Sequence, residues 1–230
     1  MNSILQDSLF FGVTLTFLAY QIGLLVNKKF KMALFNPLLI ATIFIIGVLL
    51  LFDVEYETYE LGAKYISYFL TPATVSLAIP LYRQLELLKK YPVAILGGIL
   101  TGVLTALLSI WLLSLLFGLN HQQYVTLLPK SITTAIGMGV SDKLGGIVAL
   151  TVVAISVTGI TGNVMAQTVL KLFRIQEPIA QGLAIGTSAH ALGTTKAMEI
   201  GEIQGAMSSL AIVVAGVLTV VFASLFVNFI

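Results

Sequence analysis

Cysteine is absent from this chain of 230 residues, and charged residues are scarce, at 10% of the sequence. Without cysteine the chain forms no disulfide and no thiolate metal site. An ordinary soluble domain carries roughly 25% charged residues, so this composition excludes a soluble globular protein. The formal net charge of +2 is also too small and too scattered to indicate a nucleic-acid-binding protein.

Apolar sequence takes the place of charge, because hydrophobic residues make up 58% of the chain. A helix of about 20 apolar residues crosses the hydrocarbon core of a bilayer. Five runs without Asp, Glu, Lys or Arg reach approximately that length, at residues 9–26, 34–52, 93–117, 147–170 and 206–229. The sequence therefore predicts an all-α, polytopic membrane protein in the lipid bilayer. The start, MNSILQDSLFFG, lacks a basic region, so we expect a permanent first span rather than a cleaved signal peptide.

Basic residues indicate how the chain is oriented. Lys28, Lys29 and Lys31 follow the first run, Arg83, Lys89 and Lys90 precede the third, and an acidic loop at 53–60 follows the second. By the positive-inside rule, the basic loops face the cytoplasm and the acidic loop lies outside. We therefore expect the N-terminus outside.

Three further apolar segments, at 61–84, 124–146 and 178–199, are interrupted by Pro or Gly beside hydroxyl residues. Open backbone in lipid costs several kcal/mol, so such breaks persist where protein buries them or where they line a wet cavity. Secondary transporters bind substrates at breaks of this kind. Alternatively, membrane helices tolerate Pro and Gly, and Ser or Thr bonds its own helix.

Counting these segments gives about 7–8 membrane segments, some broken or re-entrant. We expect scaffold spans in residues 1–60 and a transport core in 61–230, with broken helices near 71–76, 129–134 and 186–196. A shift of 57 residues lays TPATVSLAI (71–79) on LPKSITTAI (128–136) and Thr101-Gly102 on Thr158-Gly159, which suggests an internal repeat.

The sense of that repeat depends on which broken segments cross the bilayer. If all three cross, the chain has eight spans, and Lys171 and Arg174 lie outside, against the charge rule. If 121–143 enters and returns to the outer side, those two residues fall inside and the related units are inverted.

An ionisable group deep in a membrane is costly and is by default a candidate for function. Lys130 follows Pro129, and Lys196 follows Gly193; a cation beside a half-helix N-terminus and hydroxyl donors suits a small carboxylate. Lys196 has the alternatives of reaching the interface or pairing with Glu199. His190 and Glu199 are candidates to carry a coupled proton, although a packing histidine is an equal alternative.

The candidate substrate-binding residues are Thr74, Ser76, Lys130, Ser131, Thr133, Thr134, Thr187, Ser188, His190, Thr194, Thr195 and Lys196. No metal or cofactor is expected. GTSAH (186–190) lacks the final Gly of a nucleophile elbow, and the adjacent Lys130 and Ser131 point about 100° apart on a helix, so no enzyme is expected.

Several blocks resemble the LrgB/CidB family of bacterial membrane proteins over essentially the whole chain. They are TPATVSLAIPLYRQ (71–84), PKSITTAIG (129–137), Gly145-Gly146, TGITGNV (158–164) and GLAIGTSAHALGTTKAMEIGEIQGAMSSLA (182–211). The resemblance adds Asn163 to the candidates. Members often carry Pro where this chain has Ala135, and Ala-Arg where it has Thr195-Lys196, which replaces a planar guanidinium by an ammonium.

The resemblance implies two functions. One is a holin- or antiholin-like modulator of murein hydrolase activity and autolysis, beside a smaller LrgA/CidA-type partner. The other, from the similar plastidic glycolate/glycerate translocator, is a carrier of small monocarboxylates such as glycolate, glycerate or pyruvate. We expect the carrier, working by alternating access as a homodimer in the bacterial inner membrane, because a lesion-forming protein needs no broken helix with a buried lysine. Whether a proton is coupled stays open.

Overall fold

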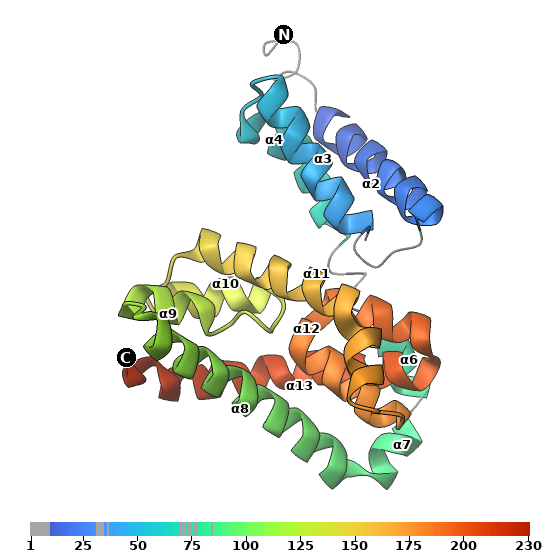
Figure 1. The fold of residues 1–230 in the computed structure, drawn as a ribbon, viewed down its shortest axis with the longest axis vertical. Coiled ribbons are helices and arrows are strands. Elements are labelled where there is room, and N and C mark those ends of the chain that lie inside the picture. The colour runs from blue at the N-terminus through green and yellow to red at the C-terminus, as the bar shows by residue number, and fades with distance from the viewer. Residues whose placement is uncertain are drawn as a thin grey trace. The chain divides into compact units, whose positions relative to one another are not determined.

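The computed structural model describes residues 10–30, 35, 37–69, 72, 75, 78–83 and 85–230. Within these ranges the chain is helical and contains no strand, which confirms the all-α class (Figure 1). The candidates Thr74 and Ser76, and most of the break predicted at 71–76, lie outside the described residues. Contacts divide the chain into two compact units, residues 1–76 and 77–230. The functional division predicted at residue 60 stays a prediction.

The first unit contains α2 (Phe10–Phe30), α3 (Pro37–Leu51) and α4 (Tyr56–Ser67). Glycine allows the helices to approach closely, because a β-carbon on Gly12 would meet the backbone of Tyr59 in α4. The hydroxyls of Thr16 and Tyr59 form a hydrogen bond of 2.9 Å beside this contact. The helix α4 therefore belongs to the N-terminal unit.

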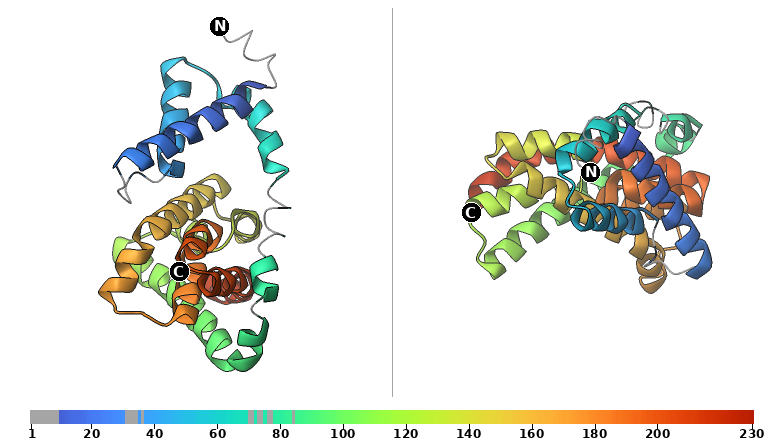
Figure 2. Two further views of the ribbon diagram at one scale, coloured as in Figure 1. Left: turned by 90° about the vertical axis from the view of Figure 1, so that its right-hand side faces the viewer. Right: turned by 90° about the horizontal axis from the view of Figure 1, so that it is seen from above.

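The second unit begins with the short helices α6 (Ala78–Arg83) and α7 (Leu85–Lys90) and the long helix α8 (Pro92–Phe117). It continues with α9 (His121–Leu127), α10 (Thr134–Lys143), α11 (Val148–Leu172), α12 (Pro178–Ile200), α13 (Glu202–Phe226) and a 3-10 turn, Val227–Phe229. The helix α13 packs against α12, α8 and α6, and Figure 2 (left) shows it in red among them. Its buried small residues let these neighbours approach.

Local sequence explains where the helices begin and end. Pro92 occupies the first turn of α8, where its missing N–H has no helical partner. Gly118 ends that helix with φ 63°, a left-handed conformation that suits glycine. Asn120 then starts α9 with a capping box. The Asn120 side chain accepts from the N–H of Gln123, and the Gln123 side chain accepts from the N–H of Asn120.

Among the described residues, α2, α8, α11 and the segment Glu202–Phe229 are long and apolar enough to cross a membrane. The helix α3 is apolar but shorter, with 15 residues. These helices coincide with the five runs predicted as spans. Their outward side chains are apolar, for example Val93, Leu116 and Leu50, with 84%, 75% and 76% of their surface exposed. Such faces are compatible with lipid, so the chain is a helical membrane protein.

Residues 178–200 form a hairpin, which we call hairpin 2. At His190, φ is 41° and ψ is −138°, so α12 breaks there. In the first arm, Gly182 lies against Gln204 and Gly186 against Ser208, a parallel pairing with α13. In the second arm the pairing runs antiparallel, because Thr194 bonds Ser208 at 2.7 Å while Met198 contacts Gly205. The chain therefore enters, reverses at His190 and returns.

The break at His190 lies within 186–196, the range in which the sequence predicted a broken helix, and Gly193 of that range has another role. The glycine is used for packing, since a β-carbon on Gly193 would lie 2.6 Å from Cβ of Ala189 and 2.9 Å from Cγ2 of Ile185 in the opposite arm. A bulkier residue there would push the two arms apart. The reversal itself falls on a histidine, three residues earlier.

Residues 121–143 form a second hairpin, hairpin 1, from α9, a tip at 128–133 and α10. The returning chain lies beside the last turn of α9, because the N–H of Ile147 donates to the hydroxyl of Thr126 at 2.8 Å. The hydroxyl of Thr151 lies within hydrogen-bond distance of the Thr126 carbonyl, at 2.9 Å, and of Ser141 Oγ, at 2.6 Å. These bonds fasten both arms of hairpin 1 to the start of α11.

The two hairpins repeat at a constant offset. Hairpin 2 starts 57 residues after hairpin 1, with Pro178 against His121, and ends 57 residues after it, with Ile200 against Lys143. The helix before each hairpin also corresponds, α8 to α11. Because α11 is about 37 Å long at 1.5 Å per residue and joins the two bases, the hairpins point toward each other from its opposite ends. This is the arrangement that the inverted, re-entrant alternative predicts.

Candidate functional site

A large cavity of the second unit lies where α8, the tip of hairpin 1 and the first arm of hairpin 2 meet. Its volume is about 910 Å³. Lys130 and Ser131 line it from hairpin 1, and Thr187 and Ser188 line it from hairpin 2, just before the reversal at His190. The structure thus brings four of the predicted residues into one space.

Lys130 is the cation of this cavity. Its backbone N–H donates to the carbonyl of Leu127 at 3.0 Å, and Pro129 beside it is fully buried, which fixes the tip of hairpin 1. Its Nζ donates to the hydroxyl of Ser131 at 3.1 Å. Within the described part of the chain, Lys130 forms no ion pair. An ammonium has three donors, so two remain for an anion.

A helix N-terminus lies directly beyond the hairpin 1 tip. The helix α10 starts at Thr134, after Thr133 in an extended conformation. The first N–H groups of a helix have no helical partner and carry partial positive charge. Both threonines are half-buried and do not line the cavity. They shape the start of α10, and a direct contact with substrate stays a prediction for them.

The opposite wall of the cavity is α8, and its hydroxyl row was missed by the sequence analysis. Thr101, Thr105 and Ser109 all line the cavity, and a spacing of four residues puts them on one face of the helix. Thr101 and Ser109 donate to carbonyls of their own helix, at 2.9 Å to Gly98 and 2.6 Å to Thr105. Their lone pairs remain as acceptors, and each hydroxyl can rotate to donate instead. The regular four-residue spacing of these hydroxyl residues within an apolar run was the sequence signal that could have identified them.

Close packing positions hairpin 2 against α8. A β-carbon on Gly102 would lie 2.9 Å from Oγ1 of Thr187 and 3.0 Å from its Cβ. Thr187 is buried and donates to the carbonyl of Leu183 at 2.8 Å. Glycine at 102 therefore brings this arm of hairpin 2 directly onto α8, where Thr187 and Ser188 reach the cavity.

The cavity extends to one end of α8. Tyr91, immediately before α8, and Glu177, immediately before hairpin 2, both line it. From Tyr91 to Ser109 the lined stretch of helix is about 27 Å long at 1.5 Å per residue. The cavity is therefore a deep cleft that starts at the base of hairpin 2 and ends near the tip of hairpin 1.

Comparison with known proteins assigns the architecture to a family. The profile of the LrgB-like family matches residues 16–229. The chain belongs to the LrgB-like family. The "Antiholin-like protein LrgB" of Bacillus mycoides (strain KBAB4) is 40% identical over 96% of both chains. Proteins with the same name in Bacillus cereus (strain B4264) and Bacillus anthracis (strain CDC 684 / NRRL 3495) have the same identity and coverage. No solved structure matches the chain. These names describe no enzyme.

In this LrgB-like protein the remaining candidates of hairpin 2 lie outside the cavity lining. His190 is buried, and its Nε2 lies 3.0 Å from the carbonyl oxygen of Ile155 in α11. Thr194 donates to the carbonyl of His190 at 2.9 Å and bonds Ser208 of α13 at 2.7 Å. Both residues hold the hairpin 2 tip in place, and substrate binding by them stays a prediction.

Asn163 of the LrgB-like protein also fastens this tip. Its Nδ2 donates to the carbonyl of Leu192 at 2.7 Å and to the hydroxyl of Thr195 at 3.0 Å. Thr195 itself is exposed and donates to the same Leu192 carbonyl at 2.7 Å. The motif that carried the family resemblance thus links α11 to the returning arm of hairpin 2.

Lys196 pairs with Glu199, which was one of the alternatives that the sequence left open for it. Its Nζ forms an ion pair with Glu199 Oε2 at 2.7 Å, and the side chains are 25% and 64% exposed. Neither residue lines the cavity. Among the described residues, no cluster of three His, Cys, Asp or Glu side chains could hold a metal ion.

Proposed function

We propose that this LrgB-like protein is a secondary transporter of small monocarboxylates of the glycolate, glycerate or pyruvate class. The observation that carries the proposal is the position of Lys130, at the tip of a re-entrant hairpin and inside a deep cleft. A cation in a membrane interior is costly unless it serves a ligand or an ion pathway. A small carboxylate would accept hydrogen bonds from the Lys130 ammonium, and its 2-hydroxyl would donate to the α8 hydroxyls.

The opposed hairpins supply a path for alternating access. The cleft reaches the base of hairpin 2, at the end of α8 that Lys89 and Lys90 precede. By the positive-inside rule this is the cytoplasmic end. The bound anion would sit between the two hairpin tips, and rearrangement of one hairpin against the other would close the cleft and open the opposite end. Placement in the bacterial inner membrane is part of this proposal.

Proton coupling through His190 or Glu199, and assembly as a homodimer, belong to the same proposal. Uptake of a labelled carboxylate driven by an imposed pH gradient tests the coupling. A coupled carrier accumulates substrate when the gradient is applied, and collapse of the gradient by a protonophore abolishes the accumulation. Light scattering coupled to size-exclusion chromatography tests the dimer.

A second function is favoured by the names of the relatives, which are called antiholin-like. As an antiholin-like modulator of murein hydrolase activity and autolysis, the protein would act with a LrgA/CidA-type membrane partner. Those names support this second function more directly than they support transport, whereas the lysine-containing cleft between hairpins supports transport.

One reconstitution separates the two functions. The purified chain is placed alone in proteoliposomes with either labelled glycolate and pyruvate outside or a large fluorescent dye inside. A carrier takes up the carboxylates in a saturable way and retains the dye. A lesion-forming protein releases the dye, and a modulator that needs its partner is inactive in both assays until the partner is added.

A further inference from the structure

A separate cavity of about 340 Å³ lies at the base of hairpin 2. The end of α11, the turn that follows it and both ends of α12 form its walls, and it shares no lining residue with the cleft of Lys130. Lys171, Arg174 and Gln181 are the polar side chains that matter here. The proposed transport function leaves this cavity without a role.

The cavity is cationic and its charges are not neutralised by the protein. Lys171 and Arg174 line it and no acidic side chain does. Among the described residues neither cation forms an ion pair. The acids that follow in the chain do not line this cavity, since Glu177 lines the cleft of Lys130, Glu199 pairs with Lys196 and Glu202 lies 3.9 Å from Arg83.

The backbone places Arg174 in an unusual way. Its φ is 54°, and the N–H of Ile175 donates to the carbonyl of Leu170 at 2.9 Å, which closes the C-terminus of α11. This left-handed position normally takes Gly or Asn. The helix dipole favours a cation such as Lys171 in the last turn, but it does not explain an arginine at a position that suits glycine. A strained residue of this kind points to a functional demand on its side chain.

The wall of the cavity opposite α11 is held rigidly. Gln181 Nε2 donates to the carbonyl of Ile175 at 2.8 Å, and its Oε1 accepts from Gln204 Nε2 at 2.9 Å. These bonds tie the turn after α11 to α12 and α13. The two cations therefore border a formed cavity rather than a flat surface.

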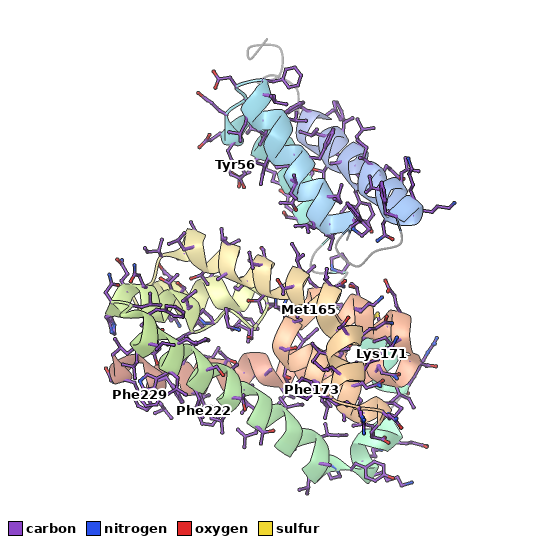
Figure 3. All side chains as sticks on the ribbon, in the orientation of Figure 1. Tyr56, Met165, Lys171, Phe173, Phe222 and Phe229 are labelled. Carbon is purple, nitrogen blue, oxygen red and sulfur yellow. The ribbon has the colours of Figure 1, made fainter. Side chains whose placement is uncertain are left out.

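We propose that this cavity binds the phosphate of an anionic lipid headgroup. Guanidinium and ammonium groups are the usual protein partners of phosphate. Leu172 and Phe173, which are 73% and 69% exposed, directly follow Lys171 in the chain at the end of the span. Figure 3 labels Lys171 and Phe173. This apolar border would contact the acyl chains of a lipid, whereas a free phosphate has no apolar group to place there. The cavity is on the side of Lys89 and Lys90, the cytoplasmic leaflet by the charge rule, where anionic lipids attract basic residues.

Native mass spectrometry of the full-length protein, released from detergent with phosphatidylglycerol or phosphatidylcholine of the same chains, tests the proposal. The test variant combines Lys171→Gln with Arg174→Gly, because glycine suits the left-handed position and preserves the fold. The control variant, Lys89→Gln with Lys90→Gln, removes the same charge on the same side from exposed residues outside the described cavities. A circular dichroism melt verifies that both variants are folded.

The expected result is that wild type and control retain phosphatidylglycerol over phosphatidylcholine, and that the test variant loses about tenfold in this retention, as one charge-assisted hydrogen bond would give. Equal loss in both variants would mean diffuse attraction and would overturn the proposal. A parallel titration with inorganic phosphate distinguishes the source. If inorganic phosphate binds the wild type through the same residues and phosphatidylglycerol does not, the cavity takes a free anion and the lipid proposal is wrong.

Discussion

Gly102 of α8 and Thr187 of hairpin 2 touch without an intervening side chain, because a β-carbon on Gly102 would lie 2.9 Å from Thr187 Oγ1 and 3.0 Å from its Cβ. Rotation of the threonine relieves the first contact but not the second, since Cβ is fixed by the backbone. The contact determines how close hairpin 2 comes to the cleft. It also provides a sharp test of the packing.

Gly102→Ala is expected to destabilise the protein by about 1–3 kcal/mol, the usual cost of overpacking. Gly97→Ala in the same helix is the matched control, because nothing lies within 4 Å of its β-carbon. Alanine is the better helix former by about 1 kcal/mol, so the control should be neutral or stabilised. Thermal melts in detergent measure both. Equal midpoints for the two variants would show that α8 and hairpin 2 are not in contact.

The contact between hairpin 2 and α13 should be less tolerant still. A β-carbon on Gly186 would lie 2.6 Å from the carbonyl oxygen and 2.8 Å from the Cα of Ser208, both backbone atoms. We expect Gly186→Ala to lower the folded yield on size-exclusion chromatography well below that of Gly139→Ala, whose β-carbon meets nothing within 4 Å. A normal yield and melting midpoint for Gly186→Ala would refute the parallel pairing of this arm with α13.

The buried hydroxyl of Thr194 should matter more than the exposed hydroxyl next to it. Thr194→Val removes bonds of 2.9 Å to the His190 carbonyl and 2.7 Å to Ser208. The buried groups left without a partner are expected to cost about 1–3 kcal/mol. Thr195→Val is the control, because Thr195 is exposed and surface substitutions usually stay within about 0.5 kcal/mol. Denaturant titrations measure the free energy of unfolding of both variants. A larger loss for Thr195→Val than for Thr194→Val would contradict this prediction.

The opposite entry of the hairpins is tested by cysteine labelling, which the absence of native cysteine makes clean. Asp142→Cys lies at the base of hairpin 1, and Arg174→Cys lies just before hairpin 2; both native residues are exposed. A membrane-impermeant maleimide added to intact cells should label Asp142→Cys, and Arg174→Cys should react only after the membrane is opened. Labelling of both from one side would exclude the inverted arrangement.

Much of this fold could be predicted from the sequence, because long apolar runs have one stable solution in lipid. The run at 93–117 became α8 (Pro92–Phe117), and the run at 147–170 became α11 (Val148–Leu172). The offset of 57 residues, first seen in a short sequence match, is also the offset between the two hairpins. Periodicity and apolar length depend on the chain alone, so these features could be predicted from the sequence.

The site was only partly predictable, because its geometry depends on tertiary contacts. Lys130 and Ser131 follow a proline break and do line the cleft. The reversal at His190, by contrast, is stabilised by its 3.0 Å bond to the Ile155 carbonyl in another helix. The sequence around His190 does not predict this contact. The role of Gly193 is also tertiary, because the two arms of hairpin 2 pack against each other there.

The most direct test of the account is uptake of labelled glycolate and pyruvate into proteoliposomes by Lys130→Met. Methionine keeps the length of the side chain and removes the ammonium that lies 3.1 Å from Ser131 Oγ. Loss of a hydrogen bond to a charged group costs about 1.5–3 kcal/mol, so initial uptake below saturation should fall roughly 10- to 100-fold. Lys143→Met, at the exposed base of hairpin 1, should transport like wild type. If Lys130→Met takes up the carboxylates as fast as wild type does, the cleft is not their binding site.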